Sequence, residues 1–120
     1  MKRYLIIGAS PNESRYSYAA VSRLRQRGFE VVALGTRNGT IGGVPIVTDI
    51  TKVTKSIHTI SIYLRKELQI NYYSHILDLK PKRIIFNPGA ENDELYDMAQ
   101  TAGIEVLNAC MLVMISTASI

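Results

Sequence analysis

The sequence predicts an α/β protein of the Rossmann-like, doubly wound type, with a mostly parallel sheet of about five strands in a three-layer αβα arrangement. Short apolar runs typical of buried strands alternate with helical segments along nearly the whole chain. Most of these segments are bounded by glycine, proline or asparagine. The chain has 120 residues, of which 47% are hydrophobic, so residues 1–120 are expected to form a single domain around one core.

The N-terminal part is expected to form a strand, a loop, a helix and a second strand. An apolar run over residues 4–8 predicts the first strand, and residues 9–14 predict a loop. The helix after the loop has four small or apolar residues at the spacing i, i+3, i+4 and i+7, namely Ser17, Ala20, Val21 and Leu24. Gly28 is placed to end this helix, and the second strand is expected over residues 29–34.

The next segment is rich in turn residues. Residues 35–43 contain four glycines and are expected to form a loop with several turns. Residues 44–47 predict a short extended piece, which Pro45 weakens as a central strand because proline lacks a backbone donor. Asp49 or Thr51 is then expected to cap a helical turn.

The second half begins with a strand rich in β-branched residues, expected over 59–64. Residues 67–79 predict a helix with three apolar residues on one side, namely Ile70, Tyr73 and Leu77. Pro81 prevents this helix from continuing, and a buried strand is expected over 83–86.

The C-terminal part is expected to form a helix, a strand and a final packed helix. Asn92 is placed to cap the first of these helices, which Gly103 ends. Its core face is expected to carry Leu95, Met98, Ala99 and Ala102. The last strand is expected over 104–107, and the apolar tail over 110–120 is expected to end as a packed helix.

Composition and charge argue against several classes of protein. The net charge of +4 is modest, and the basic residues are scattered rather than clustered, so nucleic acid is not an expected partner. No segment approaches the roughly 18 apolar residues of a membrane span, and the N-terminus lacks the apolar core of a signal peptide. Cys110 is the only cysteine, so no intrachain disulfide can form. These features predict a cytoplasmic protein.

The loop after the first strand carries the main functional pattern. In open parallel sheets, ligands bind at the carboxyl ends of the strands. Gly8 allows close approach of a ligand, while polar side chains and a cation follow at Ser10, Asn12, Ser14 and Arg15. The next helix directs free N–H groups to the same place, which suits a phosphate or pyrophosphate. The alternative is a loop whose serines only satisfy the helix N-terminus, and neither a G-x-G-x-x-G nor a P-loop motif is present.

The end of the second strand narrows the choice of ligand. Proteins that bind NAD usually place a carboxylate there, whereas this chain has Thr36 and Arg37. A cation at that position attracts a ribose phosphate, which NADP and coenzyme A (CoA) carry and NAD does not. The alternative for Arg37 is an exposed loop arginine with no ligand.

The chain resembles the small CoA-binding proteins related to the nucleotide-binding domain of the succinyl-CoA synthetase α subunit. The resemblance is carried by segments 8–12, 15–18, 36–38, 41–46, 48–50, 92–94 and 102–104, and it covers nearly the whole length. It implies a Rossmann-like CoA-binding fold. It does not imply ligase activity, which in the synthetase needs a second domain with a phosphorylated histidine.

The resemblance also implies roles for particular residues. Gly8, Ser10 and Asn12 would line the pyrophosphate, with Arg15, Tyr16 and Ser17 nearby. Arg37 takes the place where relatives often carry a lysine that meets a phosphate. Tyr63 and Leu64 follow the strand that lies along the adenine or pantetheine arm in relatives.

No catalytic or metal-binding constellation is apparent. His58 and His75 are not spaced with other ligands as metal sites require, and Cys110 is expected to be an inert thiol. The leading hypothesis is therefore a protein that binds CoA or an acyl-CoA without catalysis of its own. A homodimer is considered as its assembly. The alternatives are an NADP-linked reductase, a CoA-dependent transferase, or a structural partner subunit that docks through residues 111–120.

Overall fold

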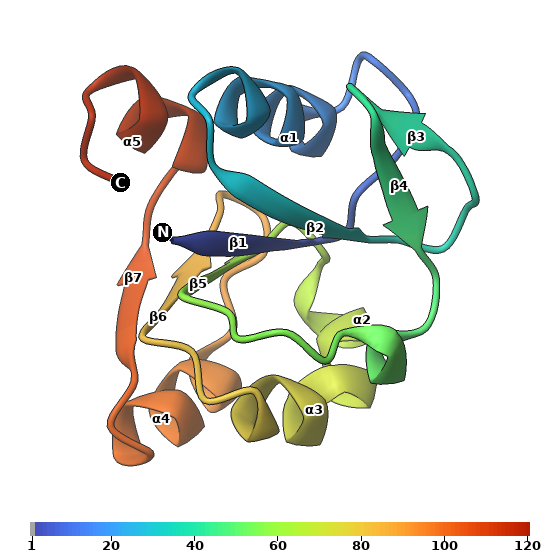
Figure 1. The fold of residues 1–120 in the computed structure, drawn as a ribbon. Helices are drawn as coiled ribbons and strands as arrows, with labels where there is room; N and C mark the ends of the chain where they lie inside the picture. The colour runs from blue at the N-terminus through green and yellow to red at the C-terminus, as the bar shows by residue number, and fades with distance from the viewer. Residues whose placement is uncertain (1) are drawn as a thin grey trace.

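The computed structural model describes residues 2–120 and confirms the predicted fold class. Within these residues a single sheet contains seven strands, where the sequence predicted about five (Figure 1). The strands are β1 (Arg3–Ile7), β2 (Glu30–Leu34), β3 (Thr40–Ile41), β4 (Val44–Val47), β5 (Thr59–Ile62), β6 (Arg83–Phe86) and β7 (Glu105–Asn108). Their order across the sheet is β3-β4-β2-β1-β5-β6-β7, and every pair is parallel except β3 with β4.

The two additional strands, β3 and β4, form an edge of the sheet that the sequence predicted as loop and as a short extended piece. Only Ile46 and Val47 of β4 pair with β2, while Pro45 is exposed and faces Thr40 of β3. Pro45 is therefore placed where no donor to β2 is required, which explains how a proline fits into this strand.

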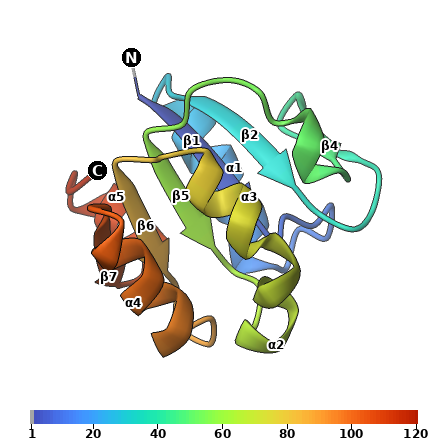
Figure 2. The same cartoon turned by 90° about the horizontal axis from the view of Figure 1, so that it is seen from below.

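Helices cover both faces of the sheet. On one face lie α1 (Tyr16–Gln26) and α5 (Met111–Ser116). Helix α5 is formed by the apolar tail. On the other face lie α2 (Lys66–Gln69), η2 (Ile70–Tyr72), α3 (Tyr73–Asp78) and α4 (Asp93–Thr101), as Figure 2 shows from below. The 3₁₀ turn η1 (Ile50–Lys52) follows β4 and is capped by the Asp49 side chain. Within residues 2–120, every helix falls short of the length and hydropathy that a membrane span requires.

Each face of the sheet has its own apolar core. The core under α1 and α5 contains Ala20, Val21 and Leu24, which are fully buried and pack in one cluster with Met111 and Ile115. Ser17, the fourth residue predicted for this face of the helix, is also buried. The core under α3 and α4 is built around Ile76, Leu95 and Ala99. Both faces of the central strands are thus covered, which explains their near-continuous hydrophobic sequences.

The helix predicted over residues 67–79 is broken into α2, η2 and α3. Isoleucine, asparagine and tyrosine at the break are weak helix formers, so tertiary contacts can override the helical pattern. Gln69 turns inward at this point, and its Nε2 donates to the carbonyls of Leu64 (2.7 Å) and Ala90 (2.8 Å). The break places Ile70 on the surface with 61% exposure, so the prediction that it faces the core is wrong.

Helix α4 follows the prediction at its ends but not over its whole core face. The Oδ1 of Asn92 accepts a hydrogen bond from the Leu95 amide, as expected of a cap. Leu95 and Ala99 are fully buried, whereas Met98 and Ala102 are exposed and were wrongly assigned to the core. Helix α4 packs beside β7, which is the edge strand of the sheet. Among residues 2–120 no strand lies beyond β7, and this explains why Met98 and Ala102 of the helix stay exposed.

Candidate functional site

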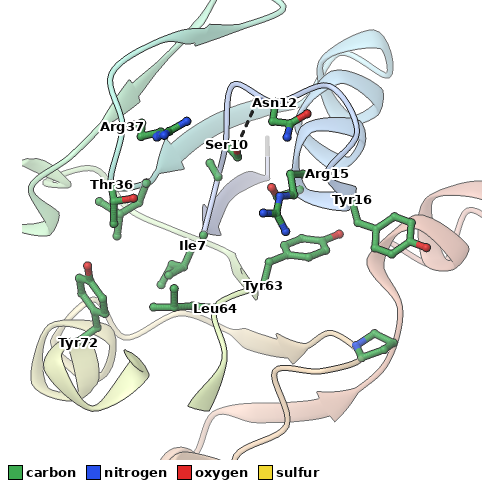
Figure 3. A pocket seen from close by; sticks show the side chains of 16 residues that line it. Ile7, Ser10, Asn12, Arg15, Tyr16, Thr36, Arg37, Tyr63, Leu64 and Tyr72 are labelled. Carbon is green, nitrogen blue, oxygen red and sulfur yellow. Dashed lines mark hydrogen bonds between the residues drawn. The ribbon is translucent and has the colours of Figure 1, made fainter. Parts of the chain in front are cut away.

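A cavity of about 480 Å³ lies at the carboxyl ends of β1, β2 and β5 (Figure 3). Strand β1 connects through α1 to β2 on one side, and the chain later returns to β5 on the other side of β1. The cavity is therefore at the topological switch point, where open α/β sheets bind ligands.

Ten of the eleven residues predicted for the site line this cavity, and Ser14 does not. Those that line it are Gly8, Ser10, Asn12, Arg15, Tyr16, Ser17, Thr36, Arg37, Tyr63 and Leu64. The structure thus brings together the β1–α1 loop, the residues after β2 and the residues after β5. The sequence did not single out the other lining residues, which are Ile7, Ala9, Leu34, Gly35, Tyr72 and Pro88.

The β1–α1 loop is held by its own side chains. The Oγ of Ser10 accepts a hydrogen bond from the Asn12 amide (3.1 Å), and Asn12 Oδ1 accepts from the amide (3.0 Å) and the hydroxyl (2.8 Å) of Ser14. Ser14 therefore supports Asn12 instead of facing the cavity. This arrangement leaves the Ser10 hydroxyl hydrogen and the Asn12 Nδ2 amide available to a ligand.

Two glycines allow the loop to pass close to its neighbours. Gly8 has a φ of +92°, and a Cβ there would lie 3.0 Å from the Leu64 amide nitrogen. A Cβ on Gly35 would lie 2.2 Å from the carbonyl oxygen of Ala9. The amides of Gly8 and Ala9 both donate to the Leu34 carbonyl at 2.9 Å, so the start of the loop is fixed to the end of β2.

The N-terminus of α1 contributes donors to the cavity. Within residues 2–120, the amides of Tyr16 and Ser17 have no acceptor, as expected at the first turn of a helix. Arg15 precedes the helix, and its guanidinium lies between the β1–α1 loop and the Tyr63 ring (Figure 3). Free amides, the helix dipole and a cation therefore act on the same space.

Arg37 supplies a second cation on the β2 side of the cavity (Figure 3). Among residues 2–120 it has no hydrogen-bond or ion-pair partner on its side chain. The charge of the cavity is thus positive, because its lining contains two arginines and no carboxylate.

The opposite wall of the cavity is apolar and aromatic. It consists of Ile7, Tyr63, Leu64, Tyr72 and Pro88. Tyr72 comes from η2 and Pro88 from the turn after β6, so both reach the cavity through tertiary packing. The cavity therefore has one anion-attracting side and one side suited to an organic chain or ring.

Comparison with known protein families identifies this architecture. A family model described as a CoA binding domain matches residues 2–116. The chain belongs to this family. The resemblance inferred from the sequence is therefore confirmed, and the cavity lies at the switch point of this domain.

Several solved structures are similar to this chain. A crystal structure of an uncharacterized protein is 40% identical, with coverage of 100% of this chain and 98% of that chain and a TM-score of 0.95. The structure of cell-free ID.343 from Thermus thermophilus is 18% identical, with coverage of 99% and 90% and a TM-score of 0.87. A conserved hypothetical protein from Pyrococcus furiosus is 22% identical, with coverage of 94% and 98% and a TM-score of 0.80. A search of curated proteins found no match.

The residues considered for catalysis lie apart from one another in this CoA-binding domain. His58 directly precedes the amino end of β5, whereas the cavity lies at the carboxyl ends of the strands, and His75 lies in α3. Cys110 is a free, partly exposed thiol before α5. Within residues 2–120, no three His, Cys, Asp or Glu side chains gather as metal ligands would.

Tyr63 lines the cavity with its ring, and its buried hydroxyl has no hydrogen-bond partner among residues 2–120. Burial, and to a lesser degree the nearby Cys110, raises the pKa of this hydroxyl above its usual value of 10.0. The Tyr63→Phe variant should therefore keep its stability at pH 7 or gain about 1 kcal/mol, because it removes an unsatisfied polar group. Thermal unfolding at pH 7 measures this, and a loss of more than about 1 kcal/mol would show that the hydroxyl has a partner.

The same group predicts a change with pH. An unfolded tyrosine loses its proton near pH 10, whereas folded Tyr63 retains it, so stability falls as the pH rises above 10. The Tyr63→Phe variant should lose less stability than the parent between pH 9 and 11. Tyr4, whose pKa burial also raises, keeps part of the effect in both proteins.

Proposed function

We propose that this protein binds coenzyme A or an acyl-CoA in the cavity at the switch point. The observation that carries the proposal is that a positive loop side and an aromatic side meet in one cavity of a CoA-binding domain. CoA has a matching division, because its nucleotide end carries phosphates and its pantetheine arm is largely uncharged.

The donors on the positive side fit a pyrophosphate. The free amides of Tyr16 and Ser17, the Asn12 side-chain amide and the Arg15 guanidinium all adjoin the same loop. None of these groups is neutralised by a carboxylate in the lining. We infer that they hold the pyrophosphate, while Tyr63, Leu64 and Tyr72 contact the uncharged parts of the ligand.

Arg37 is assigned to the ribose phosphate, which CoA has and dephospho-CoA lacks. Arg37→Ala should weaken CoA binding about tenfold and leave dephospho-CoA binding nearly unchanged, since a charged hydrogen bond is worth about 1.5 kcal/mol or more. Isothermal titration calorimetry with both ligands, on the parent and the variant, measures the difference. Arg15→Ala should instead weaken both ligands to a similar degree, because both contain the pyrophosphate.

A matched control is Arg23→Ala, which removes an exposed arginine from the far part of α1. It should bind both ligands as the parent does. Equal loss of CoA and dephospho-CoA affinity in Arg37→Ala would remove the assigned role of Arg37. Absence of CoA binding to the parent at millimolar concentration would overturn the proposed function.

Calorimetric titration with NADP separates CoA from the other cofactor that the sequence left open. NADP also carries a ribose phosphate, so tighter binding of NADP than of CoA would favour a reductase. We propose a binding protein without a reaction of its own, and turnover of an acyl-CoA by the purified protein would contradict that part of the proposal.

A further inference from the structure

A second hollow lies at the opposite end of the strands from the switch-point cavity, beside the amino ends of β1, β5 and β6. Its volume is about 490 Å³, and it is lined by Lys2, Arg3, Ser56, Ile57, His58, Lys80 and Lys82. The surrounding chain is tied together by backbone bonds, because His58 donates to the Arg3 carbonyl and its own carbonyl accepts from Lys82 and Arg83. The hollow is therefore a fixed part of the fold.

The lining of this hollow is basic and contains no carboxylate. Arg3 is already engaged, since its guanidinium pairs with Glu30 (2.6 Å) and donates to the Ser56 carbonyl (2.7 Å). Lys2, Lys80 and Lys82 form no ion pair within residues 2–120. Three lysines thus line one concave surface whose lining contains no carboxylate.

A buried cation lies directly behind the hollow. His58 Nδ1 is 2.7 Å from Thr59 Oγ1, and the same oxygen accepts a hydrogen bond from Arg83 Nε at 3.2 Å. Arg83 is only 9% exposed, forms no ion pair, and has a buried terminal nitrogen without a partner in residues 2–120. Buried cations are usually paired, so this guanidinium adds positive potential that the chain leaves uncompensated.

We propose that this hollow binds a phosphate group, either as inorganic phosphate or as the terminal group of a small phosphorylated molecule. The lysine ammonium groups and the protonated His58 ring surround the anion, while Thr59 links His58 to Arg83. This site lies at the opposite end of the strands from the switch-point cavity, so it neither requires nor excludes CoA binding.

His58 reports on the charge in the hollow. Burial lowers the pKa of His58, and the cations Lys2, Arg83 and Lys82 lower it further, while Glu105 of β7 opposes them. The ring of Tyr4 in β1 also faces it, with ring centroids 6.5 Å apart. A bound phosphate would offset these cations, so binding should raise the pKa of His58 and be accompanied by proton uptake.

NMR of the imidazole protons can measure this directly, because the chain has two histidines and His75 serves as an internal reference. Titrations of pH are run in 20 mM sodium phosphate and in sodium chloride of equal ionic strength. The pKa of His58 should be higher in phosphate by about half a unit or more. The His75 signals should respond alike in both salts. Phosphate that enters the switch-point cavity does not affect this readout.

Lys82→Ala provides the discriminating variant, because Lys82 is exposed and its backbone bond to His58 is retained. Without phosphate, the pKa of His58 should rise in this variant, since one repelling cation is lost. The further rise caused by phosphate should shrink by about half or more. Lys52→Ala, which removes an exposed lysine from η1, should behave as the parent. Equal values for His58 in phosphate and chloride, or an undiminished response in Lys82→Ala, would overturn the proposal.

Discussion

Gly35→Ala is expected to destabilise the protein by about 2–3 kcal/mol and to abolish most of its CoA binding. The added Cβ would lie 2.2 Å from the Ala9 carbonyl oxygen, which is backbone and cannot rotate away. Either the β1–α1 loop or the end of β2 must then move, and both line the cavity. Thermal unfolding should show a decrease in Tm of about 10 °C, and calorimetry should show at least a tenfold loss of CoA affinity.

Gly28→Ala is the matched control for this substitution. Gly28 has a φ of +85°, but a Cβ there would meet nothing within 4 Å. This variant should therefore lose about 1 kcal/mol from backbone strain alone and bind CoA as the parent does. If Gly35→Ala is no less stable than Gly28→Ala and binds CoA normally, the close contact between the β1–α1 loop and β2 does not shape the cavity.

Asn87→Ala is expected to cost about 2–4 kcal/mol of stability, because it breaks three buried hydrogen bonds. The Asn87 Nδ2 donates to Ser61 Oγ (2.8 Å) and to the Ile62 carbonyl (3.0 Å), and Oδ1 accepts from the Met111 amide (2.8 Å). Asn87 thus joins β5 and β6 to the start of α5. Its loss leaves the Met111 amide buried without a partner, and chemical denaturation measures the resulting loss of stability.

Asn108→Ala is a suitable comparison, because Asn108 is exposed at the end of β7 and its side chain forms no hydrogen bond within residues 2–120. It should change stability by less than about 0.5 kcal/mol. A loss in Asn87→Ala no larger than in Asn108→Ala would mean that water or a nearby group replaces the buried bonds.

The sequence predicted the parts of the fold that local pattern determines. The apolar runs located β1, β2, β5, β6 and β7 to within two residues, and Asn92 was correctly identified as a cap. The same reasoning brought Gly8, Ser10 and Arg37 to one cavity, because parallel strands place their carboxyl ends at the same edge of the sheet. Their roles toward a ligand stay predictions.

Other features depend on contacts that no local pattern carries. Gln69 lies at the break in the helix predicted over residues 67–79, and it donates both to Leu64, just before that segment, and to Ala90, which is 21 residues further along the chain. The same break carries Tyr72 to the cavity, where sequence spacing gave no reason to expect it. The basic hollow was missed for a similar reason, since its lining comes from three separated segments, 2–3, 56–58 and 80–82.

We propose that CoA occupies the cavity between the β1–α1 loop and the aromatic wall. A titration of the ¹⁵N-labelled protein with CoA, followed by amide chemical shifts, tests it most directly. We expect the largest changes at Ser10, Tyr16, Ser17, Thr36 and Leu64, with little change at Lys82 and Glu105. Changes concentrated away from the carboxyl ends of β1, β2 and β5, or no saturable change at all, would contradict it.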